Sequence, residues 1–271
     1  LALPEAEMRV DTESGSARLS PGLFAKAGLL GTIELEENDL SRYFGEGRHH
    51  PEYEEGRLWS FFSDRGGHVV LADKERGVLR PHGHLLRSGG GWVADESSMA
   101  STAWMGGVFH SMVTQGHVSI NRFLSTCHSY VGLFRSHGLR VFAELDEEWQ
   151  LLQLPSAFEM ELGSCRWIYR HGGGVIEVIS TARTDRHELG LSLSVLEGQA
   201  CRFLISMHVA LNGDDGSPSI PACWERNGSG VFVRAVPDSD VGRRFPNGGF
   251  YVGFGKDAGI ETIGGDELLF P

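Results

Sequence analysis

The stretch RWIYRHGGGVIEVISTARTD, which runs from Arg166 to Asp185, decides the fold class of this chain. Trp167 and Tyr169 alternate with arginines, as side chains on the two faces of a β-strand do. A second β-rich run, VIEVI, follows the three glycines at 172–174. A phosphate-binding glycine loop would instead open a helix, whose amides and dipole face the anion. The pattern therefore predicts a hairpin that turns at His171–Gly174 with positive φ angles.

Similar patterns continue on both sides of this hairpin. In LGLSLSVLEG (189–198), leucine and valine occupy one face, while glycine and serine occupy the other. Further runs that indicate strands, separated by Gly, Asp and Asn, lie at 140–154, 201–216, 230–236 and 248–255. The charged segment GEGRHHPEYEEG (45–56) is typical of a surface loop. Sustained helical periodicity is hard to find. The spacing predicts an all-β chain, a large antiparallel β-sandwich with few short helices.

Length and charge limit the classes of function. The chain has 271 residues, 41% of them apolar, and a formal net charge of −12. That charge argues against nucleic acid and against an anionic membrane surface as partners. No apolar run is long enough to span a membrane. Because the chain opens with LALPEAEM and stops at DELLFP, we expect residues 1–271 to be a single β-sandwich domain from a longer, multidomain protein.

Cysteine and histidine spacing predicts neither a metal site nor a cofactor. The four cysteines form no CxxC pair. Cys127, Cys165 and Cys201 lie in apolar runs, which indicates buried free thiols and a reducing, cytoplasmic compartment. His82 and His84 share a face if they lie on a strand, which is a metal-like spacing. However, no carboxylate follows within residues 85–90, so the pattern of a metal site is broken.

One segment has the composition of a sugar site. WMGGVFHSMVTQGHVSINR (104–122) combines an aromatic ring, imidazoles, amides and a guanidinium with few acids. Aromatic faces suit CH-rich sugar rings, and planar amides or guanidinium groups suit hydroxyls. The alternative is a core strand and loop with satisfied polar groups. The carbohydrate-binding candidates are Trp104, His110, His117, Asn121 and Arg122.

No catalytic residue is predicted. The chain has no GxSxG motif, and no cysteine stands in a recognisable catalytic context. Asp146, Glu147 and Glu148 fit a solvated turn between strands better than a pair of glycosidase carboxylates. Glu159 and Glu161 follow PSAF and are no more specific.

Several of these runs together resemble a known family. GGVFHSMVTQGHVSINRF, LRVFAEL, LLQLPSAFEM, CRWIYRH, VIEVISTARTD and LGLSLSVLEG are similar to the N-terminal domain of glycoside phosphorylases of the cellobiose and chitobiose phosphorylase type. The resemblance covers roughly residues 20–255 as a strand pattern. It implies a β-supersandwich related to galactose mutarotase. It also implies an oligosaccharide substrate and an (α/α)6 barrel, later in the same parent chain, that carries the general acid.

The resemblance makes one function the leading hypothesis and leaves two alternatives open. The leading hypothesis is a non-catalytic, carbohydrate-associated domain of a phosphorylase or hydrolase-like enzyme, which shapes the substrate cleft or supports a homodimer. Its parent would be a glycosyltransferase or phosphorylase. The first alternative is a stand-alone aldose 1-epimerase, in which His110 or His117 would act with Glu144 or Glu177. The second is a lectin-like sugar-binding module.

Overall fold

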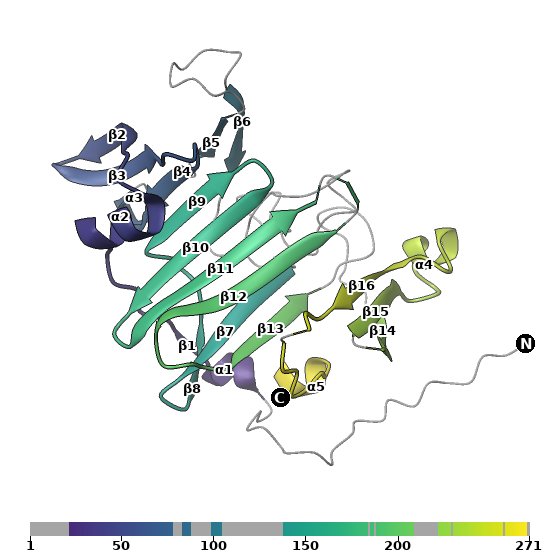
Figure 1. Ribbon diagram of the computed structural model, residues 1–271. Helices are drawn as coiled ribbons and strands as arrows, with labels where there is room; N and C mark the ends of the chain where they lie inside the picture. The colour runs from purple at the N-terminus through teal and green to yellow at the C-terminus, as the bar shows by residue number, and fades with distance from the viewer. Residues whose placement is uncertain are drawn as a thin grey trace, which may run out of the picture.

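The computed structural model shows a molecule built mainly of β-strands (Figure 1). It describes residues 22–77, 83–87, 99–104, 138–183, 185–186, 188–208, 222–228, 230–256 and 258–269. Helices within these ranges have only four to eight residues. None of the described helices has the length and apolar character needed to cross a membrane. The predicted all-β class is confirmed.

The larger sheet contains seven strands in the order β12-β11-β10-β9-β4-β3-β2. All of its neighbouring strands run antiparallel. Its β4 and β9 are neighbours although the long segment 72–156 separates them in sequence. The strands are β2 (His49–Glu54), β3 (Arg57–Phe62), β4 (His68–Leu71), β9 (Ala157–Glu161), β10 (Ser164–His171), β11 (Gly174–Ala182) and β12 (Leu189–Gly198).

The hairpin predicted from Arg166 to Asp185 is formed by β10 and β11. Its turn is Gly172-Gly173, between the paired residues His171 and Gly174. A positive φ occurs at Gly174 (154°), where a Cβ would lie 2.0 Å from the carbonyl oxygen of Glu197. Glycine is therefore required at that position, because the end of β12 approaches the backbone of the hairpin closely.

The smaller sheet has four strands in the order β1-β8-β7-β13. The strands β1 and β8 run parallel, whereas the pairs β8–β7 and β7–β13 are antiparallel. The turn from β7 to β8 consists of Asp146 and Glu147, both with positive φ (51° and 65°), as a tight two-residue hairpin requires. The strands are β1 (Gly28–Leu29), β7 (Gly138–Leu145), β8 (Glu148–Leu151) and β13 (Phe203–His208).

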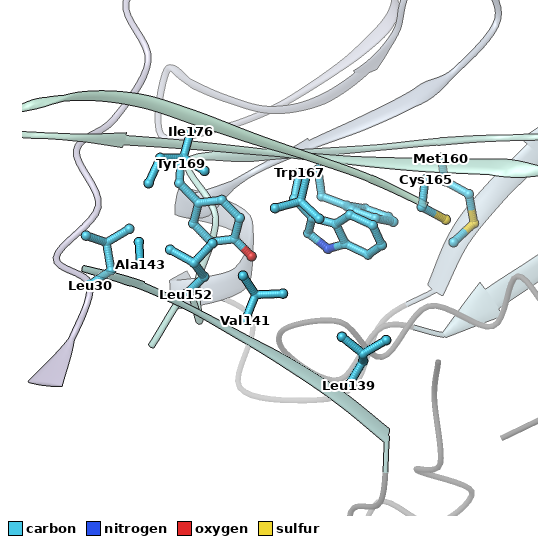
Figure 2. Close-up of a cluster of buried hydrophobic side chains, with 12 residues drawn as sticks. Leu30, Leu139, Val141, Ala143, Leu152, Met160, Cys165, Trp167, Tyr169 and Ile176 are labelled. Atoms are coloured by element: carbon cyan, nitrogen blue, oxygen red, sulfur yellow. The ribbon is translucent and has the colours of Figure 1, made fainter. Parts of the chain in front are cut away.

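The two sheets enclose the main hydrophobic core. Figure 2 shows Trp167 and Tyr169 pointing from β10 toward Val141 and Leu152 of the smaller sheet and its flank. The Trp167 ring also packs on Phe158, with ring centroids 5.2 Å apart. The buried members of this core are Leu30, Leu139, Val141, Ala143, Leu152, Phe158, Met160, Cys165, Trp167, Tyr169, Ile176 and Val178. This face-to-face packing confirms the predicted sandwich.

The larger sheet also buries part of its opposite face, called the outer face below. The helix α2 (Glu37–Phe44) begins with a capping box between Glu36 and Asp39. Its side chains Leu40, Tyr43 and Phe44 lie over a second core. The strand residues of this core are Phe61, Val69, Ala157, Ile168 and Val175. Strands β9 and β10 are therefore covered on both faces.

Two smaller sheets and four short helices complete the described fold. One sheet is the pair β5 (Gly83–Arg87) and β6 (Met99–Trp104). The other has three antiparallel strands, β14 (Ala222–Asn227), β15 (Gly230–Ala235) and β16 (Gly249–Gly253), and lies on the opposite side of Figure 1 from β2 and β3. The helices are α1 (Leu23–Lys26), α3 (Ala72–Gly77), α4 (Asp240–Arg244) and α5 (Asp266–Leu269).

One expectation was wrong. Much of the segment predicted as a surface loop, residues 45–56, forms the edge strand β2, which pairs with β3. Nearly all of its residues are exposed, and it carries charges that protect an edge from pairing with another chain. Because neither face of β2 is buried, its sequence lacks the apolar alternation by which a strand is recognised.

Candidate functional site

A group of charged side chains lies on the outer face of the larger sheet, next to α2. Alternation along β9 points Glu159 and Glu161 to this face, since Phe158 and Met160 point into the main core. The same alternation adds Arg166 of β10 and Glu177 of β11, and the turn between β3 and β4 adds Ser63 and Arg65. We call this group the outer-face cluster; it consists of Ser63, Arg65, Glu159, Glu161, Arg166 and Glu177.

Glu159 is the centre of the outer-face cluster and is only 1% exposed. The Ser63 hydroxyl donates to its Oε1 at 2.8 Å. Nη2 of Arg65 donates to its Oε2 at 2.9 Å, and Nη1 of Arg166 lies 3.6 Å from the same oxygen. A buried carboxylate is tolerated only with such partners. Glu159 therefore acts as a fixed acceptor that joins β9 and β10 to the turn between β3 and β4.

Arg166 extends the cluster toward α2. Its Nε donates to Oε1 of Glu177 at 2.6 Å, and its Nη1 donates to the carbonyl oxygen of Tyr43 at 2.6 Å. The guanidinium lies 5.3 Å from the ring centroid of Phe44. Arg166 therefore ties the last turn of α2 to the sheet through hydrogen bonds, an ion pair and a cation–π contact.

The space beside Glu159 is too small for a sugar. A cavity of about 100 Å³ is lined by Arg65, Glu159, Glu161, Ser164, Arg166 and Ile179. Pockets for small organic ligands usually measure about 300–1,000 Å³. The cavity has the polar lining and the volume for a few water molecules. The geometry indicates a structural role for the outer-face cluster.

The surroundings of Glu161 change its pKa. Burial raises the pKa of Glu161 above its ordinary value, and the neighbouring Glu159 carboxylate raises it further. Arg65, whose Nε lies 3.5 Å from Oε1 of Glu161, opposes this rise only in part. The folded chain therefore binds the Glu161 proton more tightly than the unfolded chain does.

Replacing Glu161 with glutamine should stabilise the chain in a pH-dependent way. Because the pKa is raised in the folded state, ionised Glu161 lowers stability once the pH exceeds its ordinary pKa. We expect Glu161→Gln to raise the thermal unfolding midpoint at pH 7 and to leave it close to wild type at pH 4. Circular dichroism melts at both pH values measure this. Glu54→Gln, at an exposed position of β2, controls for the change in net charge. An equal change at both pH values would contradict the prediction.

A larger cavity of about 420 Å³ lies beside Arg202. Nε and Nη2 of Arg202 donate to the two carboxylate oxygens of Glu144 at 2.6 and 2.7 Å. Nη1 donates to Glu261 at 3.0 Å, so the segment before α5 is joined to the smaller sheet. Burial and Glu144 raise the pKa of the Cys201 thiol, which favours its neutral form. The cavity is lined by Glu144, Glu147, Ala200, Cys201 and Arg202.

The sugar-binding candidates chosen from the sequence are only partly within the described structure. Trp104 is the last residue of β6, where it pairs with Gly83 of β5. His110, His117, Asn121 and Arg122 lie outside the described residues. These assignments remain predictions.

The two glutamates considered for epimerase chemistry are both occupied. Both carboxylate oxygens of Glu144 accept hydrogen bonds from Arg202, and Oε1 of Glu177 accepts one from Arg166. A general base needs a carboxylate oxygen that can reach the proton it removes. The ion pairs direct these carboxylates to guanidinium groups instead. The histidines proposed as their partners are outside the described ranges.

The described residues contain no group of three or more His, Cys, Asp and Glu side chains that could hold a metal ion. His84 lies in β5 opposite Ala103, while His82 is outside the described part. Cys165, Cys201 and Cys223 are free thiols. The fourth cysteine, Cys127, also lies outside that part.

The importance of Glu159 was not recognised from the sequence. The run AFEME alternates, which places Glu159 and Glu161 on one face of β9. What the sequence does not show is that the Ser63–Arg65 turn folds over this face. Ser63 and Arg65, the hydrogen-bond partners of Glu159, lie 96 and 94 residues away from it in the chain.

Comparison with known proteins places these features in context. A family described as "Glycoside phosphorylase supersandwich domain" matches residues 46–270. The 1,2-beta-oligoglucan phosphorylase of Listeria innocua serovar 6a is 29% identical over 164 residues, which are 60% of this chain. The matched region is 15% of that relative, so the chain corresponds to a small part of its length.

Proposed function

The chain belongs to the glycoside phosphorylase supersandwich domains, and from this premise we propose that it is a non-catalytic, carbohydrate-associated domain that shapes the substrate cleft of a larger enzyme. In this proposal, residues 1–271 are one β-sandwich domain in the N-terminal part of the parent protein. Catalysis belongs to an (α/α)6 barrel of the same parent chain. The proposal extends to a galactose mutarotase-like origin of the sandwich and to a homodimer as the assembled form.

The observation that carries the proposal is that three glutamates on the two large sheets are each bound to an arginine. Glu144, Glu159 and Glu177 each accept hydrogen bonds from an arginine at 2.6–2.9 Å. A catalytic acid or base must exchange a proton with substrate. Carboxylates fixed by guanidinium groups instead hold strands and segments together. This arrangement supports a scaffold that positions other groups.

The substrate class follows from the relative. Its name describes a phosphorylase that acts on 1,2-β-oligoglucan. We propose the same substrate class for the parent of this chain, which would make the parent a glycosyltransferase. The free thiols Cys165, Cys201 and Cys223 fit a reducing, cytoplasmic location.

An activity assay on two polypeptides tests the proposal. The 271-residue chain and the polypeptide of its complete reading frame are each incubated with 1,2-β-oligoglucan and phosphate, and glucosyl phosphate is measured. We expect product from the complete polypeptide and none above buffer from the chain. Mutarotation of glucose, followed by polarimetry, should also remain at the buffer rate with the chain. Phosphorolysis by the chain alone would refute the non-catalytic role, and faster mutarotation would establish the epimerase alternative.

A further inference from the structure

The three-stranded sheet β14-β15-β16 presents a face on which two aromatic side chains sit among glycines. The antiparallel register places Glu225, Phe232 and Tyr251 side by side across the sheet. One neighbouring row on the same face is Asn227, Gly230 and Gly253. The other neighbouring row is Cys223, Arg234 and Gly249. We call this face the aromatic platform.

The glycines allow both rings to lie down on the backbone. A Cβ on Gly230 would lie 2.4 Å from Cζ and Oη of Tyr251, and one on Gly253 would lie 3.1 Å from Cε1 of the same ring. On the other side, a Cβ on Gly249 would lie 2.6 Å from Cζ of Phe232. Each ring therefore covers a glycine, instead of standing away from the sheet.

Tyr251 is held in this position while much of it faces solvent. Its hydroxyl donates to the carbonyl oxygen of Asn227 at 3.0 Å, which fixes the far end of the ring on β14. The residue is nevertheless 50% exposed. With one side of the ring on glycine backbone, the exposed part includes its opposite face. A rigid aromatic face is thus ready to bind a partner without further ordering.

Polar side chains border the rings. Glu225 is directly opposite Phe232 in the register, and Arg234 stands in the next row; both are exposed. A carboxylate accepts hydrogen bonds from hydroxyl groups, and a guanidinium donates several in one plane. The platform therefore combines a flat apolar surface with both kinds of hydrogen-bonding group that a sugar needs.

We propose that the aromatic platform binds a glucosyl ring of a β-linked glucan, stacked on Tyr251. In β-glucopyranose the hydroxyls are equatorial, so the two faces of the ring expose C–H groups. Those weakly positive hydrogens match the negative face of an aromatic ring, and the hydroxyls at the rim are suited to the polar border of the platform, which includes Glu225 and Arg234. The choice of glucan rests on the proposed function, whereas the site itself rests on the geometry of the sheet.

Calorimetric titration of the 271-residue chain with a 1,2-β-linked oligoglucan tests the site. We expect Tyr251→Ala to weaken binding about 3- to 10-fold, the range for loss of one aromatic contact. Tyr251→Phe should retain most of the affinity, because it keeps the stacking face. Tyr53→Ala removes a tyrosine of similar exposure (57%) from β2 and should bind like wild type. Thermal melts confirm that each variant is folded.

The possible results separate this proposal from the proposed function. Equal affinity of wild type and Tyr251→Ala would overturn the platform, and so would no measurable binding by the wild-type chain. Glucosyl phosphate production by the chain would refute the non-catalytic role but leave the platform standing if Tyr251→Ala still weakens binding. Sedimentation of the same variants tests the alternative that the platform contacts a second copy of this chain. If Tyr251→Ala abolishes self-association and leaves glucan affinity unchanged, the platform is an interface and the proposal fails.

Discussion

Replacing Trp167 with alanine is expected to lower the free energy of unfolding by about 3–5 kcal/mol. The residue is 1% exposed, and its indole fills the space between the two sheets against Phe158. Alanine would lose the transfer energy of the indole and leave a cavity that the neighbouring strands cannot close fully. Urea denaturation followed by circular dichroism measures the change. A loss of this size removes a large part of the stability of an ordinary domain.

Trp224 provides the matched control. It has the same side chain but lies on β14 with 37% of its surface exposed. Trp224→Ala should cost about 1 kcal/mol or less, as exposed substitutions usually do. If the two variants lost similar stability, Trp167 would not be the centre of the core.

Replacing Glu159 with alanine is expected to cost about 2–4 kcal/mol of unfolding free energy. The change removes the acceptor of Ser63 and Arg65 and an ion-pair partner of Arg166 from a nearly closed site. Loss of one partner of a buried ion pair is normally more costly, but Arg65 is 59% exposed, and water takes over part of its solvation. Chemical denaturation measures the loss.

Two further variants identify the cause of that loss. Glu159→Gln keeps the side-chain volume and one oxygen acceptor, so it should cost less than alanine. Glu161→Gln removes a carboxylate from the same face two residues later and should not destabilise the chain at pH 7. If Glu159→Ala proved as harmless as Glu161→Gln, the ion pairs of Glu159 would not join the strands.

The sequence predicted the strands that have one face in the core. Trp167 and Tyr169 on β10 alternate with arginines, and the leucines of β12 alternate with glycine and serine, because the main core lies on only one side of each strand. The turns at Gly172-Gly173 and Asp146-Glu147 were also recognisable. Both depend on local chemistry, which a linear sequence contains. The supersandwich was inferred from these runs together, and the family match confirms it.

Long-range contacts could not be predicted. Nothing in the sequence around His68–Leu71 indicates that β4 pairs with β9, since any apolar strand would offer a similar partner. The same holds for the Ser63 and Arg65 contacts of Glu159. The aromatic platform likewise depends on a register that brings Tyr251 over Gly230. The run GGFYVGFG contains its glycines and rings but not their juxtaposition.

The long segment between β4 and β9 also affects how the chain folds during translation. The β2–β3–β4 ribbon is made first, and β4 then presents an unpaired apolar edge until β9 has been synthesised. Translation at about 5–20 residues per second delays β9 by roughly 5–20 s, far longer than hairpins need to form. During that interval, the nascent chain offers a template to any other exposed strand. Slower elongation through residues 72–156 should therefore lower the yield of soluble protein, and a chaperone that covers apolar strands should restore it.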